Sequence, residues 1–185
     1  NEYNPVITPD GKALYFSSTR KGNLGGTLLI DGGYAEDIYF TTLLNNTWQK
    51  PKAYRSTRVN TFGHDMISSI SEDNTTMILS AVNGKQLDLF TCKQEGKKGK
   101  TRWSMPVPMD NTINSPKEHE FYGVLSPDGQ TLYFVATRKD GFGGKDIYSA
   151  ERISDKKWAK PINLGPTINT PYDEDTPFMA ADGVT

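Results

Sequence analysis

The sequence has little cysteine and histidine, no long apolar run and almost no net charge. A single thiol among 185 residues, Cys92, excludes an intrachain disulfide and a thiolate metal cluster. No apolar stretch approaches the roughly 18 residues that a membrane-spanning helix needs, so a membrane span is excluded. The 21 basic and 22 acidic side chains give a net charge of −1, which provides no sign of a nucleic-acid or anionic-membrane partner.

Motifs of several enzyme classes are missing as well. The chain contains neither the Gly-x-Ser-x-Gly elbow of serine hydrolases nor the His-Glu-x-x-His of zinc proteases. The sialidase turn Ser-x-Asp-x-Gly-x-Thr-x-Trp is absent. The glycine-rich stretch 22–26 lacks the Lys-Ser/Thr ending of a phosphate-binding loop. We therefore expect no catalytic residues in this chain.

A long internal repeat is the main positive signal. Trp48, Trp103 and Trp158 recur at intervals of 55 residues, and each is followed three residues later by a proline. An apolar–Asn step follows each tryptophan after about eleven residues, and the three steps are Val59-Asn60, Ile113-Asn114 and Ile168-Asn169. A repeat of this length is typical of solenoids and propellers.

Within a repeat the pattern is that of β-strands joined by turns. In the third repeat, an apolar run over 121–125 ends in Ser-Pro-Asp-Gly, a turn sequence with a clear mechanism. Two further β-rich stretches, 131–135 and 146–150, flank a glycine-rich turn, and a fourth strand starts at Trp158. Pro161 restricts that fourth strand to a sheet edge. The sequence predicts an all-β fold, a β-propeller of four-stranded antiparallel blades.

The length of the chain sets the number of repeats that it can contain. About 3.4 repeats fit into 185 residues, whereas closed propellers have roughly four to eight blades. We therefore expect the chain to be part of a larger propeller. The predicted blades cover about 1–60, 61–114 and 115–169, with a partial blade over 170–185.

The segments 7–20 and 125–138, each with Pro-Asp-Gly followed by an apolar strand, resemble the TolB-type WD-like propeller repeat. Asp37-Ile38-Tyr39, Asp146-Ile147-Tyr148 and the stretch 158–169 resemble a narrower branch found in Gram-negative envelope proteins. That branch often carries an OmpA-like peptidoglycan-binding domain, and some members serve type IX secretion. The resemblance implies a periplasmic or outer-membrane-associated location and other envelope proteins as partners. Peptidoglycan would be contacted only through a neighbouring domain absent from this chain.

An acidic residue recurs eight positions before each turn aspartate. These acids are Glu2, Asp65, Glu120 and Glu174, and the residues before two of them are His64 and His119. In propellers of the resembled type this strand is the innermost one, so the acids should converge on one mouth of the central channel. They would suit either a divalent cation or cationic peptide end, or structural bonds to backbone N–H groups that fix blade stacking.

Two loops depart from the repeat. The first repeat has an insertion over about 27–35 whose apolar residues are Leu28, Leu29, Ile30 and Tyr34. They either fold as a flap onto the neighbouring blade or dock a partner protein. The second repeat inserts a basic segment that includes Lys97, Lys98 and Lys100. This segment is either a solvated rim loop or a contact for an acidic partner or a lipid headgroup.

These observations favour a non-catalytic protein-binding or scaffold propeller of the bacterial envelope, part of a larger outer-membrane-associated or secretion assembly. The alternative is a propeller enzyme or binding module that acts on acidic carbohydrates with a metal in the channel. No other cofactor is expected.

Overall fold

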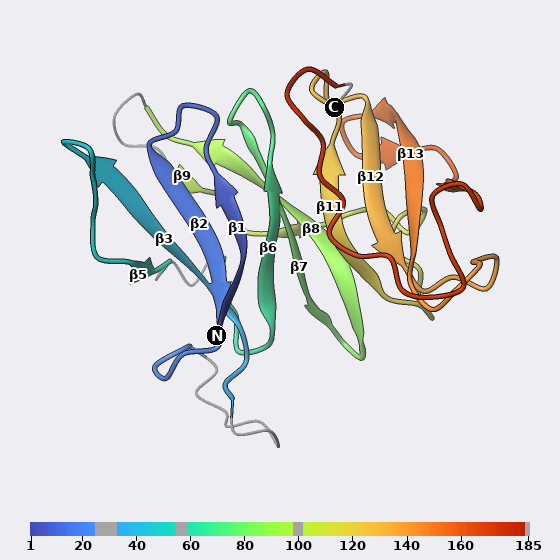
Figure 1. Cartoon of the computed structure of the whole chain (residues 1–185), viewed down its shortest axis with the longest axis horizontal. Coiled ribbons are helices and arrows are strands. Elements are labelled where there is room, and N and C mark those ends of the chain that lie inside the picture. Colours follow the sequence, from blue (N-terminus) through green and yellow to red (C-terminus); the bar gives the residue numbers. More distant parts are fainter. Residues whose placement is uncertain (25–32, 55–58, 98–101, 184–185) are drawn as a thin grey trace.

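The computed structural model describes residues 1–24, 33–54, 59–97 and 102–183. These residues form three antiparallel sheets, one after another along the chain, and contain no helix (Figure 1). No helix in this part of the chain is therefore long and apolar enough to cross a membrane. The architecture is that of an open, partial β-propeller, and we call the sheets blades 1, 2 and 3.

The strand bounds follow the same order in each blade. Blade 1 contains β1 (Glu2–Ile7), β2 (Ala13–Ser18), β3 (Asp37–Leu44), β4 (Thr47–Trp48) and β5 (Lys52–Ala53). Blade 2 contains β6 (Asp65–Ile70), β7 (Thr76–Asn83), β8 (Gln86–Glu95), β9 (Arg102–Trp103) and β10 (Val107–Pro108). Blade 3 contains β11 (Glu120–Leu125), β12 (Thr131–Ala136), β13 (Asp146–Ser154), β14 (Lys157–Trp158) and β15 (Ile162–Asn163).

The outermost strand of every blade is divided into two short pieces. In blade 1, β4 pairs with the end of β3 at Leu43 and Leu44, and β5 pairs with its middle at Tyr39 and Phe40. Pro51 lies between the two pieces, where its missing N–H interrupts the ladder. The equivalent interruption in blade 3 contains Pro161. The predicted fourth strand is therefore present at the sheet edge, as a pair of two-residue strands.

The turns between the first and second strands are alike in all three blades, although their sequences differ. Asp128 accepts hydrogen bonds from the Ser126 hydroxyl and the Gln130 N–H, and Gly129 has a φ of 69°. In blade 2, Asp73 makes the same bonds within Ser71-Glu72-Asp73-Asn74, which lacks proline and glycine. Asn74 takes the left-handed position with a φ of 55°, because its short polar side chain tolerates that region.

The core lies between the blades. One cluster joins Ile38 and Val59 of the first repeat to Ile67, Leu79 and Trp103 of blade 2. A second cluster joins Ile78, Leu89 and Ile113 of the second repeat to Phe134, Tyr148 and Trp158 of blade 3. A single sheet has two faces to bury, so stacking successive blades is what removes these aromatic side chains from water.

The asparagine of each apolar–Asn step fixes the segment that leads to the next blade. The Asn114 side-chain oxygen accepts from the Leu89 N–H at 2.9 Å, and its amide donates to the Leu89 carbonyl at 2.9 Å. Asn60 bridges Ile38 in the same way, and Asn169 bridges Ile147. Each buried asparagine therefore occupies a backbone donor and acceptor of the third strand of its own blade.

Candidate functional site

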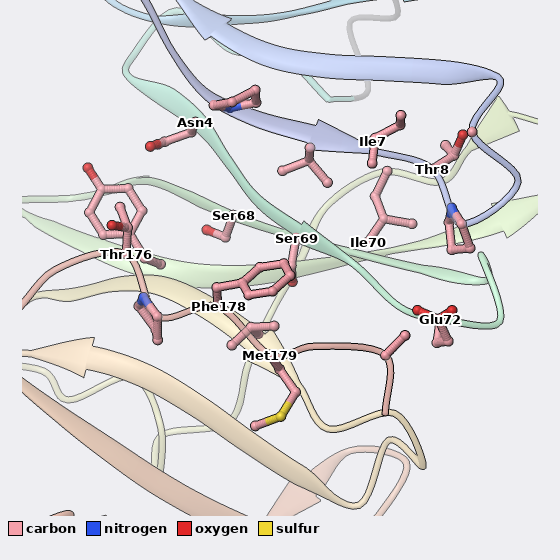
Figure 2. A pocket seen from close by; sticks show the side chains of 18 residues that line it. Asn4, Ile7, Thr8, Ser68, Ser69, Ile70, Glu72, Thr176, Phe178 and Met179 are labelled. Atoms are coloured by element: carbon pink, nitrogen blue, oxygen red, sulfur yellow. The ribbon is translucent and has the colours of Figure 1, made fainter. Parts of the chain in front are cut away.

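A cavity lies along the innermost strands of the blades. Its volume is about 600 Å³ (Figure 2). It is lined by residues 4–9 and Gly11 of β1 and its turn, by 68–70 and Glu72 of β6 and its turn, by Tyr122 and Val124 of β11, and by residues 176–179 and Ala181. β6 contacts both β1 and β11. The segment 176–181 runs beside β11 in Figure 1. The cavity therefore forms where the first strands of the three blades meet.

The cavity wall is mainly apolar and carries one charged side chain among the residues described. Ile7, Ile70 and Met179 supply apolar surface, and Glu72 supplies the charge. The ring of Phe178 projects from its segment into the space beside β6 (Figure 2) and is 85% exposed. Hydroxyl and amide groups, among them those of Ser68, Thr176 and Asn4, are interspersed. Such a wall suits an uncharged ligand that has both apolar groups and hydrogen-bonding groups.

Three wall residues have left-handed backbone conformations. Asn4, Tyr122 and Thr176 occupy equivalent positions in the first, third and fourth repeats and have φ values of 49°, 41° and 44°. In β1 and β11 the pairing with the next strand shifts register at this point. A bulge re-aims the side chains around it, and non-glycine residues adopt positive φ only where the surrounding structure holds them. The repeated bulge therefore gives the cavity wall a defined shape.

Three of the four repeated acids begin strands: Glu2 begins β1, Asp65 begins β6 and Glu120 begins β11. Glu174 lies in a segment that is not assigned to a strand. Asp65 accepts hydrogen bonds from the Thr61 N–H and hydroxyl, and Glu120 accepts from the Ser115 N–H. Glu174 accepts from the Thr170 N–H and hydroxyl. Each of these three acids thus fastens the few residues that precede it in the chain. Glu2 instead pairs with Arg20, with 2.8 Å between Oε1 and Nη2.

The environments of these acids differ. Asp65 and Glu120 are fully buried, and burial raises the pKa of each carboxyl to about 7. Bonds from Thr61 oppose that rise at Asp65, whereas the Ser115 N–H and the Arg138 guanidinium oppose it at Glu120. The Arg20 hydrogen bond lowers the pKa of Glu2. One Glu120 oxygen, Oε2, is buried without a hydrogen-bond partner.

Each of the two histidines contacts a residue of the preceding repeat. His64 Nδ1 contacts the Glu36 carboxylate, and Asp65, the next residue, donates its N–H to the Glu36 carbonyl. His119 Nδ1 accepts a 3.0 Å hydrogen bond from the Leu87 N–H. Within the described residues, no group of three or more His, Cys, Asp and Glu side chains is arranged to hold a metal ion.

The predicted loop contacts fall largely outside the described part of the chain. Leu28, Leu29 and Ile30 of the insertion lie there, as do Lys98 and Lys100 of the basic segment. Tyr34 is half-buried and Lys97 is exposed. The predicted roles of both loops in partner binding therefore remain predictions.

Sequence reasoning missed the cavity itself. Its wall begins two residues after Glu2, Glu120 and Glu174, at Asn4, Tyr122 and Thr176. The available signal was the lack of similarity among the repeats at these positions, next to acids that are nearly constant.

Neither a protein-family model nor a curated protein matches the sequence. Among solved structures, TolB from Acinetobacter baumannii superposes with a TM-score of 0.58 at 17% identity, covering 99% of this chain and 36% of TolB. Two further structures give a TM-score of 0.41, which is too low to bear on function. A prolyl endopeptidase is 12% identical, and the match covers 91% of this chain and 22% of the endopeptidase. A puromycin hydrolase mutant is 10% identical, and the match covers 99% of this chain and 32% of the hydrolase. The chain thus spans about a third of the length of TolB and shares with it the β-propeller fold.

Proposed function

We propose that this chain is a non-catalytic, protein-binding part of a β-propeller in the bacterial cell envelope. It would work in the periplasm as a scaffold within an outer-membrane-associated or secretion assembly. The observation that carries the proposal is the cavity in the channel wall, which has an apolar surface, dispersed hydroxyls and a single carboxylate. The shared fold with TolB supports it.

The lining favours a segment of a partner protein over an acidic ligand. A peptide offers both apolar side chains and backbone N–H and C=O groups, which match the hydroxyl and amide groups between Ile7, Ile70 and Phe178. The alternative, an acidic carbohydrate, needs cationic groups to offset its desolvation. Among the described residues that line the cavity, none is Lys or Arg.

The test is a change of the cavity wall that leaves the fold intact. Phe178→Ser removes the most exposed aromatic group of the wall, so its effect on stability should be small. Phe62→Ser is a matched control, because Phe62 is 79% exposed and lies outside the cavity lining. Each variant is used to capture partners from envelope extracts, and each partner identified by mass spectrometry is then titrated in purified form.

We expect Phe178→Ser to lose the specific partner and Phe62→Ser to retain it, with unchanged thermal unfolding of both variants. Equal binding by the two variants would overturn the assignment of the cavity. A parallel screen with uronate-containing oligosaccharides, with and without Mn²⁺, separates the alternative. Turnover or tight binding of such a sugar would refute the non-catalytic protein-binding function.

A further inference from the structure

An aspartate near the start of the third strand has different surroundings in blades 2 and 3. Asp88 of blade 2 and Asp146 of blade 3 occupy equivalent positions, since each pairs with the equivalent alanine of the second strand. Both oxygens of Asp146 accept hydrogen bonds, Oδ2 from the Phe142 N–H at 2.6 Å and Oδ1 from the Gly143 N–H at 3.3 Å. The glycine-rich turn before the strand therefore holds the blade 3 carboxylate.

The same turn covers Asp146 from outside. It lies against the segment 170–172, where the Gly144 N–H donates to a backbone carbonyl and a Cβ on Gly143 would collide with carbonyl oxygens. The side chain of Asn163 adds a third hydrogen bond to Asp146 at 3.1 Å. In blade 3 the carboxylate is thus 1% exposed and bonded at both oxygens.

Blade 2 lacks both the turn and the asparagine. β7 and β8 stay paired out to Asn83 and Gln86, so a tight hairpin replaces the glycine-rich turn. Pro108 takes the position of Asn163, because each pairs with the residue two places after its aspartate. A proline side chain has no hydrogen-bond donor, so blade 2 provides none of the groups that hold Asp146.

The carboxylate of Asp88 consequently keeps an unfilled oxygen. Asp88 is 7% exposed, and its Oδ2 accepts a 2.7 Å hydrogen bond from the side-chain amide of Asn83. Its Oδ1 is buried and has no hydrogen-bond partner in the described part of the chain. A buried carboxylate that lacks partners is costly, and a donor bound beside it would remove that cost.

A cavity of about 310 Å³ lies beside this carboxylate. Asn83, Gln86 and Asp88 line it from the hairpin side, and residues between Pro108 and Pro116 line it from the connection to blade 3. The part of that connection over 115–116 is equivalent to 170–171, against which the glycine-rich turn of blade 3 packs. The cavity therefore corresponds to space that blade 3 fills with its own chain.

The lining of this cavity matches an ammonium group on an aliphatic chain. Asp88 is the one charged side chain among the described residues of the lining, so a cation would balance it. The amides of Gln86 and Asn111 add neutral oxygen acceptors. Pro108 and Met109 add apolar surface, against which a methylene chain can pack while its charged end reaches the carboxylate.

Other cations fit less well. Ca²⁺ takes about six to eight oxygen ligands, and the described residues contain no group of three or more His, Cys, Asp and Glu side chains that could hold a metal ion. A guanidinium prefers to bind both oxygens of a carboxylate, but Asn83 already occupies one oxygen of Asp88. An ammonium has three donors that can reach separate acceptors, which suits one carboxylate surrounded by amides.

We propose that the cavity beside Asp88 binds a primary ammonium group at the end of an aliphatic chain, such as the side chain of a lysine. The ammonium donates to the Asp88 carboxylate and to the amide oxygens of Gln86 and Asn111, and the methylene chain packs against Pro108 and Met109. This site is separate from the cavity that contains Phe178, because the two cavities share no described lining residue.

The experiment is an NMR titration of the full-length protein labelled with ¹³C at its methionine methyl groups. Met109 lines the proposed site, Met179 lines the cavity that contains Phe178, and Met77 lies in the core between blades 1 and 2. The probes are lysine blocked at its α-amino and α-carboxyl groups, which represents a lysine of a partner protein, and cadaverine, a free diamine. Blocked lysine acetylated at Nζ has a similar chain without the charge.

We expect blocked lysine or cadaverine to shift the Met109 methyl signal in a saturable manner and the acetylated analogue to leave it unchanged. The signals of Met179 and Met77 should stay in place. Saturable binding of either amine supports the proposal, and the tighter of the two identifies the source of the ammonium group.

Two variants and a control test the role of the carboxylate. Asp88→Asn removes the charge but keeps an acceptor for Asn83, and it should weaken binding by about tenfold or more. Pro108→Asn restores the donor that blade 3 has at this position and should also weaken binding, although the charge remains. Asp155→Asn should bind normally; Asp155 is exposed and lines a neighbouring hollow of about 140 Å³ that Met109 also borders.

The Met77 signal reports the fold of each variant. The absence of a saturable Met109 shift, at every probe concentration that leaves Met77 unchanged, would overturn the proposal. So would normal binding by Asp88→Asn or Pro108→Asn, or an equal loss in Asp155→Asn. A saturable shift with Ca²⁺ but with neither amine would replace the ammonium site with a metal site.

Discussion

Neutralising Asp65 should remove a large part of the pH dependence of stability. The carboxyl is fully buried, and burial raises its pKa from 3.8 to about 7. Between those values the folded protein keeps a proton that the unfolded chain has released, so the free energy of unfolding falls as pH rises. Three pKa units correspond to about 4 kcal/mol, the order of the loss expected on going from pH 4 to pH 7.

The assay compares wild type with Asp65→Asn by urea unfolding at several pH values, followed by tryptophan fluorescence. The asparagine oxygen still accepts the Thr61 N–H, so the local bond survives. The stability of wild type relative to the variant should fall steadily from pH 4 to about 7 and then level off. A relative stability that changes by less than about 1 kcal/mol over this range would refute the reasoning, because the carboxyl would then titrate normally in the fold.

Three further predictions concern the repeat. Asn74→Gly should leave the free energy of unfolding nearly unchanged, whereas Asn74→Ala should cost about 1 kcal/mol, because the residue has a φ of 55°; urea unfolding of both variants measures this. Trp158→Ala should lower the free energy of unfolding by about 3–5 kcal/mol, because Trp158 is buried between blades 2 and 3. Trp48→Ala should lower it by less than about 1 kcal/mol, because Trp48 is partly exposed. Equal losses of stability in thermal unfolding would contradict the exposure of Trp48. Asn114→Ala should cost about 1–3 kcal/mol because it leaves the Leu89 N–H buried without its partner, while the Leu89 carbonyl keeps the hydrogen bond from the Met109 N–H. Hydrogen exchange at the Leu89 amide should accelerate strongly.

The fold was predictable because the residues that pack the blades together and shape their edges recur in the sequence at a fixed interval. Tryptophan and proline recur at fixed positions because blades 2 and 3 pack the tryptophan against the preceding blade, and the proline interrupts the edge strand. The turn that contains Asn74 was harder to predict, because it lacks the Pro-Asp-Gly sequence of the equivalent turns but keeps their hydrogen bonds and positive φ. Turn geometry depends on which residues tolerate a positive φ, and asparagine meets that condition without resembling Pro-Asp-Gly.

The environments of the repeated acids could not be predicted, because burial and partners depend on the blades that surround them. Glu2 and Glu120 have the same identity and the same place in the repeat. Glu2 is exposed and pairs with Arg20, whereas Glu120 is buried and its pKa is raised to about 7. What separates them is the preceding blade, which covers Glu120 and not Glu2. A periodic sequence therefore specifies where an acid lies but leaves its protonation to the packing around it.

The same logic indicates where binding specificity should lie in this protein. Positions that join blades repeat faithfully, because every contact between blades must solve one packing problem. Positions that line the cavity differ between repeats: Asn4, Tyr122 and Thr176 are equivalent, and so are Val6, Ser69, Val124 and Phe178. The equivalent of Asn4 in the second repeat, Ile67, is instead buried in the core between blades 1 and 2. Most of these residues line the cavity, on a frame that the repeated contacts hold fixed. Exchanging one channel-facing residue for its equivalent, as in Phe178→Val, should therefore alter partner affinity while leaving the free energy of unfolding almost unchanged, and titration with the identified partner beside urea unfolding measures both. A large loss of stability without a change in affinity would show that these positions serve the fold instead.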